Sequence, residues 1–180
     1  VLVALMGVPM SLLAARLRKG TRLVGYFAFR SVPRQAVWRW VMASLLLALC
    51  WDIVAGLAGR PVVTDFMRQN IETTHSDLLL LLALVVAAPA FEEVLFRGFA
   101  FAGLSKSALG ARGAIVVTAL AWALIHLQYD WIDKGAVFLF GLLLGWARVR
   151  SGSLWTPLLV HAALNALAYM EWVVLERVLA

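Results

Sequence analysis

Six apolar stretches, separated by connections that carry most of the charge, dominate this sequence. They cover residues 1–15, 37–57, 78–103, 113–127, 135–147 and 154–175. Hydrophobic residues make up 63% of the 180 residues and charged residues 14%, whereas an ordinary soluble domain is about 25% charged. One small core cannot hide that much apolar surface, and a helix of about 20 residues spans a bilayer. We therefore expect an all-α polytopic transmembrane bundle of about six spans, forming a single membrane domain over residues 1–180.

The charges are divided unequally between the two sets of alternate connections. One set, together with the first residues of the stretch at 37–57, holds eleven cations and no Asp or Glu: Arg16, Arg18, Lys19, Arg22, Arg30, Arg34, Arg39, Lys106, Arg112, Arg148 and Arg150. Cytoplasmic loops of membrane proteins carry such an excess, so we expect an integral protein of a bacterial or archaeal plasma membrane with its basic loops in the cytoplasm. Residues 18–40, where arginines alternate with aromatic residues, are predicted to be a cytoplasmic interfacial linker in contact with membrane lipid. Because topology explains the net charge of +6, a nucleic-acid partner is not expected.

Two adjacent carboxylates, Glu92 and Glu93, interrupt the third apolar stretch. Ionisable groups inside a membrane are costly and typically mark functional sites. Glu93 precedes Arg97 by four residues, so these two side chains can pair on one helix face as structural support. Neighbouring helical side chains point about 100° apart, so Glu92 is expected to face another helix, where a carboxylate can act as a general base.

Three further polar side chains lie in apolar stretches. His126 closes the fourth stretch, one turn after Trp122, and His161 and Asn165 are four residues apart in the sixth. An amide is a poor base, but it can donate hydrogen bonds to a developing oxyanion. At about 1.5 Å per residue, Glu92 and these three groups fall in one slab of the membrane, although their helices enter from alternating sides. This coincidence predicts a shared site.

The ordered set E-E-x-x-x-R, aromatic-x-x-x-H and H-x-x-x-N resembles the three motifs of the CPBP intramembrane protease family. That family includes type II CAAX prenyl proteases, bacteriocin-processing enzymes and Abi-type proteins. The resemblance covers residues 78–169, which we expect to form the catalytic core, and it extends to the residues around the motifs, 88–91 and 152–157. Trp122 departs from the family pattern, which usually has Phe at this position.

The resemblance implies an intramembrane endopeptidase that hydrolyses a peptide bond of a membrane-associated protein or peptide. The catalytic set that it implies is Glu92, His126, His161 and Asn165, supported by Glu93 and Arg97. Glu92 with His126 would activate a water molecule. His161 and Asn165 would stabilise the tetrahedral oxyanion.

The same side chains admit a second mechanism. Glu92, His126 and His161 could form a His₂Glu zinc site with one open position. Asn165 suits oxyanion binding better than zinc ligation, so we favour metal-free hydrolysis and keep zinc as the alternative cofactor.

Other functions remain open on the residues alone. A non-catalytic bacteriocin-immunity or scaffold membrane protein would use the bundle only for binding. A small transporter would use Glu92 and His126 as a proton relay, but the sequence lacks the internal repeats of many transporters. Asp52, in the second stretch, has no role that the sequence explains. His75, in a polar loop, is expected to be solvated, and nothing in the sequence shows whether the substrate is prenylated.

Overall fold

The computed structural model describes residues 7–11, 16, 23–61, 63, 64, 68, 69 and 76–178. Every regular element within these residues is a helix, which confirms the all-α prediction. Most of the span predicted over residues 1–15, and His75, lie outside the described residues.

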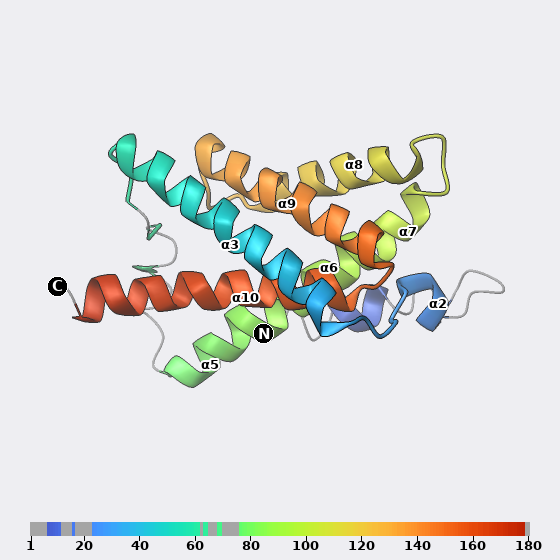
Figure 1. The fold of residues 1–180 in the computed structure, drawn as a ribbon, viewed down its shortest axis with the longest axis horizontal. Coiled ribbons are helices and arrows are strands. Elements are labelled where there is room, and N and C mark those ends of the chain that lie inside the picture. Colours follow the sequence, from blue (N-terminus) through green and yellow to red (C-terminus); the bar gives the residue numbers. More distant parts are fainter. Residues whose placement is uncertain are drawn as a thin grey trace.

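The long helices run back and forth between two ends of the bundle (Figure 1). The elements are α2 (Leu23–Phe27), α3 (Arg34–Leu57), α5 (Asp77–Leu82), α6 (Ala88–Glu93), α7 (Phe101–Leu104), α8 (Gly110–Ile125), α9 (Trp131–Ser151) and α10 (Trp155–Trp172), with π-helical segments η1 (Ala83–Ala87), η2 (Val94–Ala100) and η3 (Val173–Val178). α5, η1, α6, η2 and α7 follow one another without a break. α10 packs against α3, α6 and α9, while α8 packs along α9.

Three described helices are long and apolar enough to cross a membrane: Arg34–Leu57, Asp77–Leu104 and Trp155–Leu175. Gly110–Ile125 is a shorter apolar helix. α3 begins within the predicted linker, because Pro33 at its N-cap fixes an extended backbone there and Arg34 can start the helix. α9 extends beyond the predicted 135–147, because Asp130 caps its N-terminus and Gly152, at φ 66°, ends it in the left-handed conformation.

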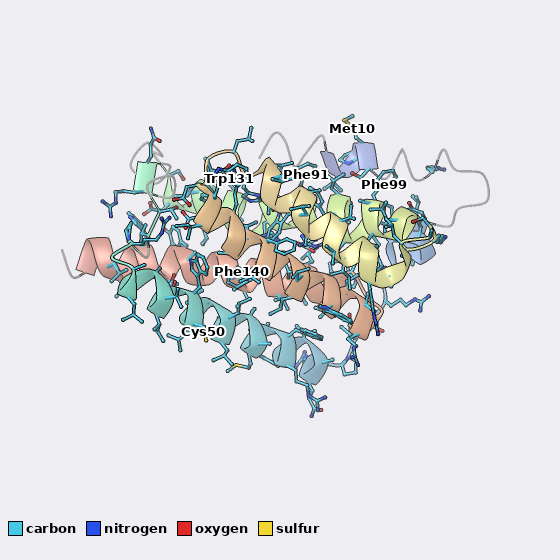
Figure 2. All side chains as sticks on the ribbon, turned by 90° about the horizontal axis from the view of Figure 1, so that it is seen from above. Met10, Cys50, Phe91, Phe99, Trp131 and Phe140 are labelled. Carbon is cyan, nitrogen blue, oxygen red and sulfur yellow. The ribbon has the colours of Figure 1, made fainter. Side chains whose placement is uncertain are left out.

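Many large apolar side chains are exposed on the outside of the bundle, whereas an ion pair lies in its interior. Leu46 of α3 is 62% exposed, whereas Glu93 and Arg97 are fully buried. Cys50 is exposed on the outer side of α3 (Figure 2). Such an outer surface is suited to lipid, so the burial pattern supports an integral membrane bundle.

Small residues let α8 and α9 pack closely. A Cβ atom at Gly141 would lie 2.9 Å from the Cβ atom of Ala119, and one at Gly145 would lie 2.8 Å from Cγ2 of Ile115. Real Cβ atoms are not found that close to a neighbour. The two glycines, four residues apart, therefore allow the close helix contact typical of small-residue motifs in membranes.

The two ends of the bundle differ in charge. The end where α3 and α8 begin and α9 finishes carries Arg30, Arg34, Lys106, Arg112 and Arg150 (Figure 1). At the opposite end, Arg60 after α3 pairs with two carboxylates at the start of α9, at 2.8 Å from Asp130 and 3.1 Å from Asp133. We call these the basic end and the acidic end.

Candidate active site

The continuous helix Asp77–Leu104 carries the two carboxylates between π-helical segments. Glu92 and Glu93 end α6, and Arg97 lies in η2. π-helical turns in otherwise α-helical stretches are rare and occur frequently at functional sites. Here they change the rotation of the helix on both sides of the Glu92–Glu93 pair.

Pro89 explains how the upstream π-helical segment contacts α10. In η1, the N–H of Ala88 donates to the carbonyl of Ala83, five residues back. The next donor in this pattern would be Pro89, which has no N–H, so the carbonyl of Leu84 lacks its helical partner. Nδ2 of Asn165 donates to that carbonyl at 2.8 Å. The proline in one helix thus creates the acceptor that fixes the Asn165 side chain of another.

Glu93 lies at the centre of a buried polar cluster. Its Oε1 atom accepts from Nη1 of Arg97 at 2.8 Å and from Nδ1 of His161 at 2.9 Å. Nη2 of Arg97 donates to the carbonyl of Gly141 at 3.2 Å, and Nε of Arg148 donates to the carbonyl of Arg97 at the same distance. The cluster therefore joins the helix that carries the carboxylates to α9 and α10.

Glu92 reaches the opposite side of the same imidazole. Its Oε2 atom lies 3.9 Å from Nε2 of His161 and accepts from the indole N–H of Trp122 at 2.5 Å. The two adjacent glutamates leave the helix in different directions, as expected, but their side chains are long enough to meet opposite nitrogens of His161. Glu92 thus faces other helices, as expected: it contacts Trp122 of α8 and lies close to His161 of α10.

His126 lies just beyond α8 and is held by its own helix. Its Nδ1 atom is 2.7 Å from the carbonyl of Trp122, which can only accept, so Nδ1 carries a proton; in the neutral tautomer with that proton, Nε2 is a hydrogen-bond acceptor. The ring stacks on Tyr129, with 5.6 Å between ring centroids and 12° between planes. The stacking restricts rotation of the imidazole.

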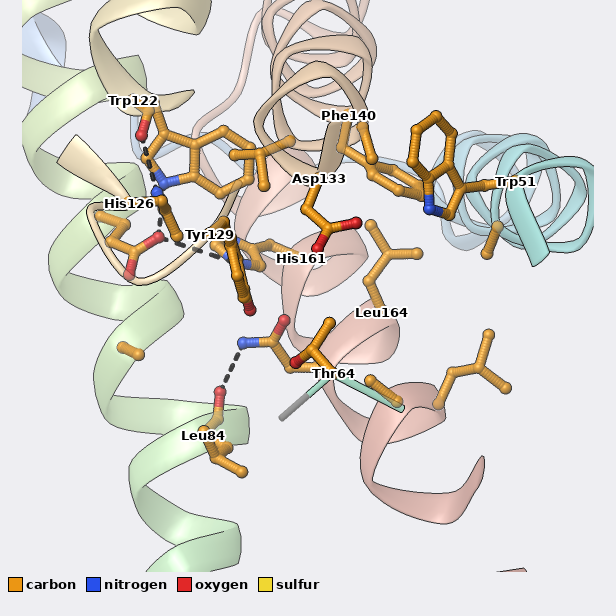
Figure 3. A pocket seen from close by; sticks show the side chains of 18 of the residues that line it. Trp51, Thr64, Leu84, Trp122, His126, Tyr129, Asp133, Phe140, His161 and Leu164 are labelled. Atoms are coloured by element: carbon orange, nitrogen blue, oxygen red, sulfur yellow. Dashed lines mark hydrogen bonds and ion pairs between the residues drawn. The ribbon is translucent and has the colours of Figure 1, made fainter. Parts of the chain in front are cut away.

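These groups line one cavity of about 420 Å³, shown in Figure 3. Its wall includes Glu92, Trp122, His126, His161 and Asn165, and also acidic residues from α3, α9 and α10, namely Asp52, Asp133 and Glu171. Thr64, Gln128 and Tyr129, which lie outside the helices at the acidic end, line it as well. The cavity therefore occupies the half of the bundle nearer the acidic end.

Two groups at that end have shifted acidities. Burial, more than any neighbouring charge, raises the pKa of the Tyr129 hydroxyl above its usual range. The backbone N–H of Asp133, followed by the Arg60 guanidinium, holds the pKa of the Asp130 carboxyl below its usual range. Tyr129 is thus a neutral hydrogen-bonding group in the cavity wall, and Asp130 is an ionised helix cap beside it.

The chemistry of Glu92, His126 and His161 matches a His₂Glu zinc set, but their arrangement does not. In the part of the chain that the structure describes, no three His, Cys, Asp or Glu side chains are grouped closely enough to hold a metal ion. Oε2 of Glu92 is engaged by Trp122. The residues as arranged do not fit zinc.

The structure brings the predicted residues together but assigns some of them different contacts. The Glu93–Arg97 pair is confirmed, with both side chains fully buried. Asn165, for which the resemblance implies a role in binding the oxyanion, donates one of its two amide hydrogens to the carbonyl of Leu84. Two contributors were missed: Tyr129, which follows His126 by three residues, and Pro89, whose missing N–H could have signalled the Asn165 contact. The catalytic roles stay predictions.

Comparison with known proteins gives two matches. The family described as type II CAAX prenyl endopeptidase Rce1-like matches residues 74–167, which include every motif residue. A protein of Escherichia coli, described as an uncharacterized 24.3 kDa protein, is 33% identical over 140 residues, or 73% of this chain and 62% of that relative. The chain thus spans less than two thirds of the relative's length. No solved structure matches the chain.

Proposed function

Because the chain belongs to the type II CAAX prenyl endopeptidase Rce1-like family, we propose that it is an intramembrane endopeptidase that hydrolyses a peptide bond of a membrane-associated protein or peptide. The observation that carries the proposal is that Glu92, His126, His161 and Asn165, from three different parts of the chain, line one cavity inside an apolar bundle. The low dielectric of an apolar bundle strengthens the electrostatic interactions on which hydrolysis depends.

Glu92 is the proposed general base. Its Oε2 atom is occupied by Trp122, whereas no hydrogen bond to its Oε1 atom is found among the described residues. The side chain is 18% exposed, so water can reach it. Oε1 takes a proton from the water molecule as the water oxygen attacks the peptide carbonyl carbon, and the lone pair on Nε2 of His126 orients that water.

His161 and Asn165 stabilise the oxyanion of the tetrahedral intermediate. When His161 is protonated, Nδ1–H donates to Glu93 and Nε2–H can donate to the oxyanion. The positive charges of Arg97 and His161 then balance the two carboxylates in the buried cluster. Asn165 has one amide hydrogen on Leu84 and a second left for the oxyanion.

The intermediate then collapses. The carbon–nitrogen bond breaks, and the proton held by Glu92 passes to the departing amine nitrogen, which leaves a new carboxyl terminus and a new amino terminus. The base thus returns to its ionised form and no other reactant is consumed.

Comparative peptidomics of membranes tests this function. Cells that lack the natural gene are supplied with the wild type, Glu92→Gln or the control Asp77→Asn, which makes the same carboxylate-to-amide change in the helix but outside the cavity. Peptides or new termini present with wild type and Asp77→Asn, but absent with Glu92→Gln, support the proposal. Identical peptide profiles for all three proteins would refute it.

A further inference from the structure

Trp122 contacts four residues of the proposed active site: Glu92, Arg97, His126 and His161. The side chain is 5% exposed. Its indole N–H donates to Oε2 of Glu92, and the Arg97 guanidinium carbon lies 4.4 Å from the ring centroid. The rings of His126 and His161 meet it edge-on, with centroid distances of 5.3 and 5.2 Å.

These contacts fix the indole and, through it, the carboxylate. The cation–π contact with Arg97 restrains the face of the indole ring. The backbone carbonyl of Trp122 binds Nδ1 of His126. The N–H bond to Oε2 selects one orientation of the Glu92 carboxylate and leaves Oε1 without a hydrogen bond among the described residues. A phenylalanine at this position would keep an aromatic ring but would lack the indole N–H that donates to Glu92.

We propose that Trp122 is a positioning residue that orients the Glu92 carboxylate for attack of water; this rests on the proposed function. Residues that orient metal-binding side chains through hydrogen bonds contribute about 10- to 100-fold, and we expect an effect of the same size for a residue that orients a general base. Trp122→Phe should therefore lower kcat by about 10- to 100-fold with little change in KM, because the cavity wall keeps its aromatic surface. Trp38→Phe, at a site on α3 that is 62% exposed, is the matched control and should leave kcat unchanged.

Indole N–H resonances test the bond without any need for activity. In ¹⁵N-tryptophan-labelled protein, the signal lost in Trp122→Phe identifies the Trp122 indole among the eight tryptophans. That signal should move upfield in Glu92→Gln and stay in place in Asp77→Asn, since a neutral amide oxygen accepts more weakly than a carboxylate.

The outcomes separate the two proposals. An unmoved resonance in Glu92→Gln, or wild-type kcat in Trp122→Phe, overturns the positioning role. Absence of Glu92-dependent cleavage by the wild type overturns the proposed function instead, whatever the resonance does.

A second, independent observation lies at the basic end. A cavity of about 550 Å³ between the start of α3 and the end of α9 is lined by Ala36, Arg39, Trp40, Trp146, Arg150 and Ser151. Neither Arg39 nor Arg150 has an anionic partner among the described residues, and the guanidinium carbon of Arg150 lies 5.9 Å from the centroid of the Trp146 ring. Two arginines that have no carboxylate partner among the described residues thus line one cavity.

The geometry points to a binding site for the phosphate of an anionic phospholipid headgroup. Arginine forks match phosphate oxygens, and tryptophan prefers the headgroup level of a bilayer. The site lies where two helices of a membrane bundle end, so a lipid headgroup can reach it from the surrounding leaflet while its acyl chains stay against the apolar outer faces of α3 and α9.

Reconstitution in vesicles of defined composition tests this site. In vesicles of phosphatidylcholine with phosphatidylglycerol, the wild type should show a higher unfolding midpoint than in phosphatidylcholine alone, and native mass spectrometry should detect retained phosphatidylglycerol. Arg39→Gln combined with Arg150→Gln should lose at least half of both effects. Arg112→Gln, an exposed cation at the same end but outside the cavity, should keep them.

Two results would overturn the site. One is equal retention of phosphatidylglycerol by the wild type and the double variant. The other is an equal rise in midpoint when glycerol phosphate is added to phosphatidylcholine vesicles, since this would show recognition of soluble phosphate and not of lipid.

Discussion

Glu93 holds His161 through a 2.9 Å contact between its Oε1 atom and Nδ1 of the imidazole, and the same oxygen accepts from Arg97. One buried carboxylate thus neutralises a guanidinium and orients a histidine. A carboxylate that fixes the far nitrogen of a histidine is a recurring way to orient an imidazole for its partner.

Glu93→Gln should therefore damage both stability and activity. Removing one partner of a buried ion pair costs about 3–5 kcal/mol, because the remaining charge has no compensation. We expect a lower midpoint of thermal unfolding in detergent and loss of cleavage. Replacing both partners, as Glu93→Leu with Arg97→Met, leaves no lone charge and should recover part of the midpoint but no cleavage. Recovery of cleavage in the double variant would contradict the orienting role.

Asn165→Ala should destabilise the protein through the Leu84 carbonyl. An unsatisfied buried acceptor costs about 1–3 kcal/mol. Pro89→Ala restores an N–H at the position that faces this carbonyl in the π-helical pattern, so Asn165→Ala should cost less in that background. A double-mutant cycle of unfolding free energies measures the difference. Equal costs in the two backgrounds would show that Pro89 does not create the acceptor.

Gly145→Ala should weaken the packing of α8 on α9. The added Cβ atom would lie 2.8 Å from Cγ2 of Ile115, and overpacking of this kind costs about 1–3 kcal/mol. Gly135→Ala is the matched control in the same helix, because nothing lies within 4 Å of its Cβ position. It should stabilise the protein by about 0.5–1 kcal/mol. Unfolding midpoints that fall equally for both variants would argue against close packing at Gly145.

Cleavage should survive removal of metal ions. The arrangement of Glu92, His126 and His161 does not fit zinc, and Oε2 of Glu92 is already bound by Trp122. Protein washed with a chelator should keep its rate and contain far less than one zinc per chain by elemental analysis. If the rate is lost on chelation and restored by stoichiometric zinc, the metal-free mechanism is wrong.

Local patterns predicted the helices and the pairing along one helix. Apolar stretches marked the long helices that the structure describes, and the four-residue spacing of Glu93 and Arg97 was enough to predict their ion pair, since both lie on one helix. The full length of α9 could also have been predicted. Asp130 is a standard helix N-cap and Gly152 a standard helix end, and the prediction overlooked both.

Contacts between helices could not be predicted from local sequence patterns. The bond from Trp122 to Glu92 depends on how α8 is rotated against α6, and the contact of Glu92 with His161 depends on π-helical turns that apolar periodicity does not reveal. The Asn165 contact needed both the π-helical pattern and the missing N–H of Pro89. Sequence spacing therefore predicted which residues meet in one cavity, but not which atoms bind.

The most direct test of the account is the cleavage rate of purified Glu92→Gln in vesicles, measured on a peptide identified by the membrane comparison. A general base contributes about 10²- to 10⁴-fold to a rate. We predict a loss in that range with an unfolding midpoint close to that of the wild type, because Glu92, unlike Glu93, is partly exposed and outside the buried ion pair. A folded Glu92→Gln protein that cleaves within a few-fold of the wild-type rate would contradict the assignment of Glu92 as the base.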